Sequence, residues 1–323
     1  MAEYINIRGQ SIEVVASDPA NPTIGQIWYN STSNTLKGGG VTTAGAWSSG
    51  GNLTQPTGFA QQGSSGTRNA ALVFGGEPLR AATEEYDGTS WTPAPNMALS
   101  KVGSTGAGLQ TATISFGGYG SPVIFLTTEE YNGTTWSPAP NMGTQRSAMA
   151  GAGTQTAALG GTGYRVPALG VSNLTEEYDG SAWTAGGTAN TSRYSAGGSG
   201  TQTAALMSGG DAPGVSAAVE QYDGSSWTTV ASLNTAKGYR GATGSQTATL
   251  VYGGNPATAA TEEWNGSSWT SVADLNTPRY SASGLGGTAS VSESLAIAGI
   301  PPGLTTEEWT PAGAPNTVTI TSS

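Results

Sequence analysis

Pairs of adjacent glutamates recur along the chain, and they are the residues that most readily suggest chemistry. They stand in the phrase Thr-Glu-Glu-Tyr or a close variant, for example at Glu84-Glu85 and Glu129-Glu130. Two neighbouring carboxylates could act as general acid and base, or bind a calcium ion. However, adjacent residues of a strand point to opposite faces of the sheet, so one pair cannot converge on one atom. A catalytic pair is also needed only once, whereas this pair is repeated.

Basic residues recur at a fixed spacing and offer the glutamates a structural partner. The tenth residue after each repeated tryptophan is Lys or Arg, and Thr57 is the exception. These basic residues are Lys101, Arg146, Arg193, Lys237 and Arg279. We predict that one Glu of each pair meets the basic residue at the start of a neighbouring inner strand, in a ring of structural ion pairs. Such pairs stabilise a protein little when they are exposed.

The composition narrows the chemistry further. The chain has 323 residues and contains neither His nor Cys, so it lacks the commonest general base, the commonest transition-metal ligand and any thiolate. We therefore expect no cofactor, no metal and no enzymatic activity. Eleven basic residues against 21 acidic ones give a net charge of −10, which disfavours nucleic acid as a partner. No stretch approaches the ~20 apolar residues of a membrane span, so membrane insertion is not expected.

The elements that carry these residues repeat. Five segments run from a Gly doublet through a variable loop, a Glu-containing strand and a two-residue turn to a Trp. The repeated tryptophans, with one extra copy at the start, are Trp47, Trp91, Trp136, Trp183, Trp227 and Trp269. From Trp91 onward they step by 45, 47, 44 and 42 residues. This period is typical of a unit of a few short strands that packs against its own copies, as in a β-propeller.

Each unit is expected to hold four antiparallel strands. In the third unit, small residues at 146–153 and 157–161 predict two inner strands, because strands near a propeller axis have little room. Residues 175–178 alternate with period two, and Asp179-Gly180 predicts a tight hairpin into a fourth strand at 182–184. The repeated Trp and Tyr side chains then form the core between units.

The combination of a Gly doublet, a Tyr in the third strand and a Trp in the fourth resembles the kelch repeat over about residues 45–309. The last copy, residues 292–309, lacks a fourth strand, and residues 46–48 form a fourth strand without its first three. We expect these two ends to complete one blade, since an unpaired edge would otherwise remain open. The expected fold is all-β: a six-bladed kelch-like β-propeller closed by an N-terminal outer strand, with a small N-terminal β-rich attachment segment.

The start of the chain lies outside the repeat. The phrase Gly-Gln-Ile-Trp-Tyr-Asn at 25–30, followed by Leu36-Lys37, resembles a segment of phage tail and fibre proteins over about residues 22–47. The resemblance implies a virion protein. It divides the chain into an attachment segment at 1–44, which binds other virion proteins, a propeller at 45–309 and a C-terminal tail at 310–323.

Binding residues usually lie in loops on a rigid scaffold. The loops after the Gly doublets vary in length, whereas the turns on the opposite face are short and uniform. Two of the variable loops carry apolar and aromatic residues, and we select Tyr119, Phe125, Tyr164 and Arg165 as candidate ligand contacts. The alternative for residues 124–126 is that they extend the third strand into the core.

Together these patterns indicate adhesion without catalysis. We expect a bacteriophage virion protein from a tail fibre or similar appendage, made in the host bacterial cytoplasm, that binds a host surface glycan or protein. One alternative is a capsid or tail decoration protein with no receptor role. A second is a carbohydrate-active propeller enzyme, because the Asp-Gly hairpins resemble the Asp-containing turns of sialidase-type propellers. The sequence also leaves a homo-oligomer open.

Overall fold

The computed structural model describes residues 12–19, 22–42, 44–55, 63–165, 170–211, 213–239, 241–285, 289–301, 303–313 and 315–320. The chain divides into two compact units: Met1–Ala46 with Thr310–Ser323, and Trp47–Trp309. The regular structure of the described residues consists of β-strands and one 3-10 helix, η1 (Val291–Glu293). The all-β prediction is confirmed.

The smaller unit is built on one four-stranded sheet in the order β1-β2-β3-β29. Its strands are β1 (Glu13–Val15), β2 (Ile27–Asn30), β3 (Thr35–Val41) and β29 (Pro315–Thr319). The indole of Trp28 is fully buried and donates a hydrogen bond of 3.0 Å to Asp18, which also accepts one of 2.7 Å from Asn30. Lys37 completes this cluster with an ion pair of 2.6 Å to the same carboxylate. The Trp-Tyr-Asn phrase therefore forms the polar and apolar centre of the unit.

The position of the C-terminal residues differs from the expected division of the chain. Residues 310–323 were expected to form a separate tail, but β29 pairs antiparallel with β3 from Pro315 opposite Val41 to Thr319 opposite Lys37. The physical reason is that β3 has a second edge that β2 does not cover, and its backbone groups need partners. Both ends of the chain thus contribute to the smaller unit.

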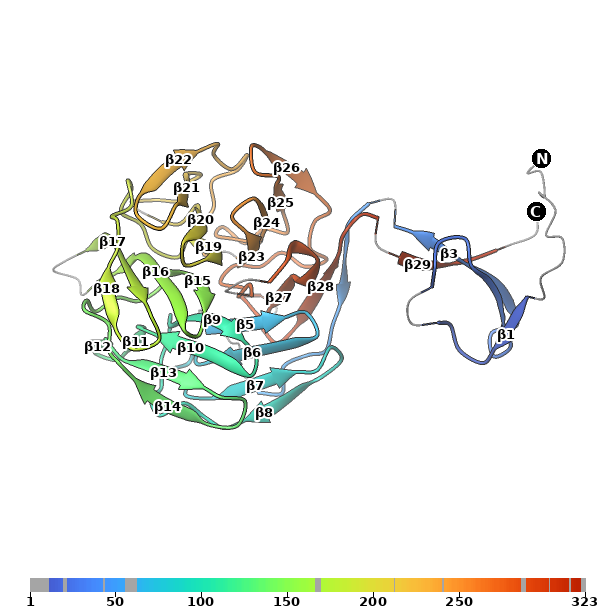
Figure 1. Cartoon of the computed structure of the whole chain (residues 1–323), viewed down its shortest axis with the longest axis horizontal. Helices are drawn as coiled ribbons and strands as arrows, with labels where there is room; N and C mark the ends of the chain where they lie inside the picture. The colour runs from blue at the N-terminus through green and yellow to red at the C-terminus, as the bar shows by residue number, and fades with distance from the viewer. Residues whose placement is uncertain are drawn as a thin grey trace. The chain divides into compact units, whose positions relative to one another are not determined.

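The larger unit contains five four-stranded antiparallel sheets, which follow one another around a ring (Figure 1). The first has β5 (Gly63–Thr67), β6 (Ala70–Phe74), β7 (Thr83–Tyr86) and β8 (Trp91–Ala94), and the second has β9 (Thr105–Leu109), β10 (Ala112–Phe116), β13 (Thr128–Tyr131) and β14 (Trp136–Ala139). The third has β15 (Ala150–Thr154), β16 (Ala157–Tyr164), β17 (Val171–Tyr178) and β18 (Trp183–Ala185). The fourth has β19 (Gly197–Thr201), β20 (Ala204–Ser208), β21 (Val219–Tyr222) and β22 (Trp227–Val230), and the fifth has β23 (Gly241–Ser245), β24 (Ala248–Tyr252), β25 (Thr261–Trp264) and β26 (Trp269–Val272).

A further sheet joins distant parts of the chain. It has the order β27-β28-β4, formed by β27 (Leu295–Ile297), β28 (Thr306–Thr310) and β4 (Ala46–Ser49). The ring of Trp47 on β4 packs against Trp309 and Tyr252, with centroid distances of 5.3 and 4.8 Å. The expected pairing of the first repeat strand with the last incomplete copy is therefore present.

The apolar core lies between sheets. Each of six buried clusters is shared by two neighbouring sheets, and one of them joins Leu295 and Ile297 to Val73 and Trp91 of the first sheet. The innermost strands approach one another so closely that a Cβ on Gly198 would lie 2.4 Å from the carbonyl oxygen of Gly151. Small residues at these positions are therefore a packing requirement. The arrangement is consistent with a propeller.

Glutamine side chains connect four of the sheets to the sheet that precedes each of them. The Gln155 amide, in the turn between β15 and β16, donates hydrogen bonds of 3.1 and 2.8 Å to the carbonyls of Thr113 and Tyr131. The equivalent residues Gln110, Gln202 and Gln246 each reach two carbonyls of the sheet before them. The Gln of the repeated turn thus has a structural role.

The Gly doublet of the third repeat is displaced from the position expected. The pair of residues with positive φ is not Gly160-Gly161 but Thr162-Gly163, with φ of 59° and 116°, and all four residues lie inside β16. In the second sheet the equivalent pair is Gly117 and Gly118, with φ of 62° and 106°. The register of the β16–β17 pair shifts between residues 161 and 163, which extends this hairpin beyond the length of the others. The second position of the pair is the one that requires glycine, because its φ lies beyond the range that L side chains adopt.

Candidate functional site

The repeated charges form buried ion pairs within single sheets. The pairs are Lys101–Glu129 at 3.0 Å, Arg146–Glu176 at 2.9 Å, Arg193–Glu220 at 2.8 Å, Lys237–Glu262 at 3.5 Å, and Arg279–Glu307. The basic side chains are at most 3% exposed and the glutamates at most 6%. Burial lowers the pKa of the Arg193 guanidinium, while Glu220 opposes that effect. The ion pairs expected from the sequence are present, but they are buried rather than exposed.

In the first sheet, the first glutamate of the pair, Glu84, accepts hydrogen bonds from backbone N–H groups and from a hydroxyl group. Thr57, the residue that breaks the basic pattern, lies outside the described residues. Glu84 accepts hydrogen bonds from the backbone N–H groups of Thr54 and Gln55 at 2.8 and 3.1 Å, and from the Thr54 hydroxyl at 2.9 Å. This carboxylate is fully buried and serves the fold.

In four of the pairs the second Glu links one sheet to a neighbouring one. The Tyr131 hydroxyl donates to Glu85 at 2.8 Å, and the Tyr178 hydroxyl donates to Glu130 at 2.9 Å. Burial, with the neighbouring Glu130, raises the pKa of Tyr178 to about 12. The two glutamates of a pair therefore have separate structural partners, which explains why both recur.

The repeated tryptophans also connect sheets. The indole N–H of Trp183 donates to the hydroxyl of Thr128 in the preceding sheet at 3.1 Å, and Trp136 donates to Thr83 in the same way. Trp47, Trp91 and Trp227 likewise donate to Thr261, Thr306 and Thr175. In the fourth sheet Val219 replaces the Thr, and Trp269 donates to the carbonyl of Ala231 instead. These rings form inter-sheet core and are not a ligand platform.

The structure places the first pair of candidate residues on a small hairpin. Tyr119 lies on β11 (Tyr119–Gly120), which pairs with β12 (Val123–Ile124). Tyr119 is 40% exposed, whereas Phe125 is half-buried and its ring covers Gly120. Ile124 is buried, and residues 124–126 precede the third strand rather than extending it. Only Tyr119 of this pair offers a substantially exposed ring.

The second pair of candidates lies at the end of the longest hairpin. Tyr164 is the last residue of β16, and the backbone N–H of Arg165 donates to the carbonyl of Gly170 at 3.0 Å. Both side chains are half-buried. The Tyr164 ring contacts Tyr194 at a centroid distance of 5.7 Å, and Tyr194 contacts Tyr239 at 5.8 Å. We call these three residues the tyrosine row.

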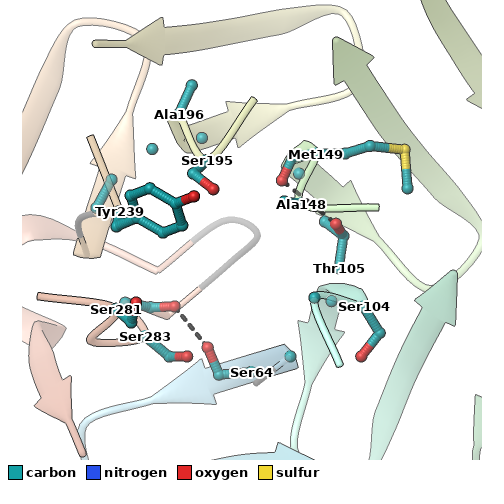
Figure 2. Close-up of a pocket in the computed structure, with 18 of the residues that line it drawn as sticks. Ser64, Ser104, Thr105, Ala148, Met149, Ser195, Ala196, Tyr239, Ser281 and Ser283 are labelled. Atoms are coloured by element: carbon teal, nitrogen blue, oxygen red, sulfur yellow. Dashed lines mark hydrogen bonds between the residues drawn. The ribbon is translucent and has the colours of Figure 1, made fainter. Parts of the chain in front are cut away.

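The tyrosine row ends at a pocket near the centre of the ring. This axial pocket has a volume of about 130 Å³ and is lined by the beginnings of the innermost strands and the residues just before them. Figure 2 shows Tyr239, Ser195, Ser104, Ser281 and Ser64 around a common space, with the Tyr239 hydroxyl near that of Ser195. No charged side chain belongs to the described lining.

A belt of backbone hydrogen bonds forms the rim of the axial pocket. The N–H of Ala148 donates to the carbonyl of Gly103, Ser195 to Ala148, Tyr239 to Ser195, and Ser281 to Tyr239, at 2.7–3.0 Å. All five residues have a positive φ, between 51° and 64°. They occupy the same repeat position, two residues after the buried basic side chain. The ion pairs therefore fix the backbone that carries the pocket.

The outer end of this site, Tyr164, was predicted from the sequence, whereas the inner residues Tyr194, Tyr239 and Ser195 were not. The signal available in the sequence was the fixed offset of two residues from each repeated Lys or Arg. At this offset the residue type differs from sheet to sheet, so the inner end of the site has different side chains in each copy of the repeat.

Within the described part of the chain, no group of three acidic, His or Cys side chains is arranged to hold a metal, and no helix is long and apolar enough to cross a membrane.

Among solved structures, that of YjhT is similar, with a TM-score of 0.64 and 13% identity over 83% of this chain and 96% of that chain. This likeness shows the fold alone and agrees with a propeller-like arrangement. No protein-family model and no curated protein sequence matches the chain.

Proposed function

We propose that the larger unit is a six-bladed kelch-like β-propeller, in which β4 is the outer strand of the last blade. Five four-stranded sheets and the β27-β28-β4 sheet support this count. Further support comes from the Ser64 hydroxyl, which donates 2.7 Å to the carbonyl of Gly284 and links the first blade to the segment before β27. A closed ring of this kind leaves no sheet edge exposed between its first and last blades.

The propeller acts as an adhesin that binds a host surface glycan without catalysis, as part of a phage tail fibre or similar appendage. The observation that carries this proposal is the tyrosine row, which leads from the longest loop to the axial pocket. Tyr rings offer an apolar face to the C–H side of a sugar and a hydroxyl for hydrogen bonding. A row of such rings suits a chain of sugar units better than a single small substrate.

The repeated carboxylates support binding rather than hydrolysis. Glycoside hydrolysis requires a pair of carboxyl groups on either side of the scissile bond. Here one set of glutamates is buried in ion pairs or bound to backbone groups, and four of the second set accept hydrogen bonds from tyrosines. These side chains are committed to the scaffold.

The smaller unit attaches the adhesin to other virion proteins. Its resemblance to a segment of phage tail and fibre proteins supports this role. The sheet has β1 and β29 as its outer strands, which have free backbone groups along one side in the described structure. Another virion protein could add a strand there.

The proposal is tested by binding of the purified protein to lipopolysaccharides and capsular polysaccharides from a panel of bacterial strains. We expect binding to at least one surface, and loss of that binding for Tyr164→Ala. The matched control is Leu109→Ala, which removes a side chain that is 50% exposed on the opposite, turn-bearing face. If no polysaccharide binds but the protein is found in virions, a decoration role replaces adhesion. Release of oligosaccharides would show an enzyme instead.

A further inference from the structure

We propose that the axial pocket is the subsite for one sugar unit at the end of the bound glycan, with Tyr239 as its platform. This inference rests on the proposed glycan binding and specifies where one unit of the ligand binds. It is carried by the size, the hydroxyl groups and the backbone conformation of the pocket.

The size of the pocket selects a single unit. Its volume of about 130 Å³ holds the centres of roughly ten water molecules. This is space for one monosaccharide ring. The rest of a glycan must extend outward, and the tyrosine row provides a path along Tyr194 and Tyr164.

Two serine hydroxyl groups beside the pocket are available to bind a ligand. The Oγ atoms of Ser104 and Ser281 are buried, and neither has a hydrogen-bond partner among the described residues. Both residues line the pocket and are only 5% exposed. Buried hydroxyls are normally hydrogen-bonded, so an unpaired pair beside a pocket indicates a ligand with matching polar groups. Sugar hydroxyls both donate and accept.

The backbone conformation of Tyr239 is the feature that indicates a ligand most directly. Its φ is 51°, in the left-handed region that bulky side chains rarely adopt. The same rim position holds Gly103, Ala148, Ser195 and Ser281 in other sheets. The fold therefore needs no aromatic ring there, and the conformation is less strained without one. The Tyr239 ring, which contacts Tyr194 on one side and lines the pocket, is therefore placed to contact a ligand.

The decisive variant is Tyr239→Gly, which removes the platform and relieves the backbone. Its matched control is Ala298→Gly, which places Gly at another residue of positive φ, outside the lining of the pocket, and removes no polar or aromatic group. The probes are methyl glycosides of glucose, galactose, mannose and N-acetylglucosamine, with glucuronic acid and N-acetylneuraminic acid as charged counterparts. Binding is measured by saturation-transfer NMR and calorimetry, and folding by thermal unfolding.

We expect at least one of these sugars to bind the natural protein and the Ala298→Gly variant alike. Tyr239→Gly should bind that sugar about tenfold more weakly or worse, a factor that corresponds to roughly 1.4 kcal/mol, without a lower melting temperature. If Tyr239→Gly fails to fold, Tyr239→Ser repeats the test with the residue found at the rim in two other sheets. Unchanged affinity in these variants overturns the inference.

The outcomes for the subsite and for adhesion can be separated. If the natural protein and Tyr239→Gly bind bacterial polysaccharide equally, adhesion stands and the axial subsite is wrong. If the natural protein binds no polysaccharide and no glycoside, both proposals fail together.

Discussion

The buried ion pairs show how a single residue is held in this fold. Arg193 has no exposed surface, donates 2.9 Å to the carbonyl of Ala218, and pairs with Glu220 at 2.8 Å. The backbone carbonyl of Arg193 accepts a hydrogen bond from Gly163 of the preceding sheet. One residue therefore joins strands of its own sheet and fixes the neighbouring sheet.

Replacing Arg193 with Met should destabilise the protein far more than an exposed pair would. The change leaves the buried Glu220 carboxylate without its counter-charge, which costs about 3–5 kcal/mol. Urea unfolding followed by tryptophan fluorescence gives the free energy. The double variant Arg193→Met with Glu220→Leu should recover part of the loss, because no charge remains buried. A loss below about 1 kcal/mol for the single variant would show that the pair is hydrated.

The Asp-Gly hairpins predict a dependence of stability on acid. Hydrogen bonds from the Thr89 hydroxyl and from the backbone of Ser90 and Thr89 lower the pKa of Asp87 to about 2. A carboxyl whose pKa is lower in the folded state stabilises the fold above its unfolded value of about 4, and this stabilisation is lost as the pH falls through about 2. Asn132 and Asn265 fill the same turn position without titrating.

The test is Asp87→Asn, which keeps the acceptor oxygen of the turn and removes the titration. As the pH is lowered from 5 to 2, the melting temperature of the natural protein should decrease relative to that of this variant. Thermal unfolding across this range measures the difference. A constant difference would mean that the turn carboxylate does not favour its ionised form in the folded protein.

At the level of elements, we predict that the glutamine hydrogen bonds between sheets contribute to the stability of the protein. Gln155→Ala leaves the carbonyls of Thr113 and Tyr131 without their side-chain donor, at a cost of about 1–3 kcal/mol. Thr111→Ala, an exposed residue of a neighbouring turn, should change stability by no more than about 0.5 kcal/mol. Chemical denaturation measures the free energy of unfolding of both variants. An equal effect of both variants would assign the stabilisation to the turn and not to the glutamine hydrogen bonds.

The repeat elements could be predicted because each carries its own local signal. The tryptophans, the paired glutamates and the basic residues recur in one order, and two-residue periodicity assigns them to strands. The positive-φ pair Thr162-Gly163 within β16 could not be predicted, since Gly160-Gly161 offers a more obvious doublet two residues earlier. The pairing of β29 with β3 also has no local signal, as it joins residues from opposite ends of the chain.

The candidate site was harder to predict than the fold for a physical reason. Tyr164 lies at the end of β16 and was identified from the composition of the segment after the Gly doublet. The axial pocket arises where positions some 45 residues apart converge, and their residues share a backbone conformation but not a side-chain type. Gly103, Ala148, Ser195 and Tyr239 have no common side-chain chemistry, and in the sequence they share only their offset from the repeated Lys or Arg.

For the whole molecule, the sheet β27-β28-β4 predicts that β4 is needed to close the ring. A chain of residues 45–310 keeps this strand, whereas a chain of residues 51–310 lacks it and loses the Trp47 contacts to Trp309 and Tyr252. We expect the shorter chain to melt at a lower temperature or to aggregate through the uncovered edge of β28. Thermal unfolding and light scattering measure both. Equal behaviour would mean that closure does not depend on β4.

The placement of β4 also sets the order of folding events during synthesis. The ribosome makes β4 first, and its partner β28 follows roughly 250 residues later, which at about 5–20 residues per second is a delay of roughly 13–50 s. The smaller unit is completed later still, because β29, which pairs with β3, follows β28 in the chain. A chain released from a stalled ribosome before β28 is made therefore completes neither unit.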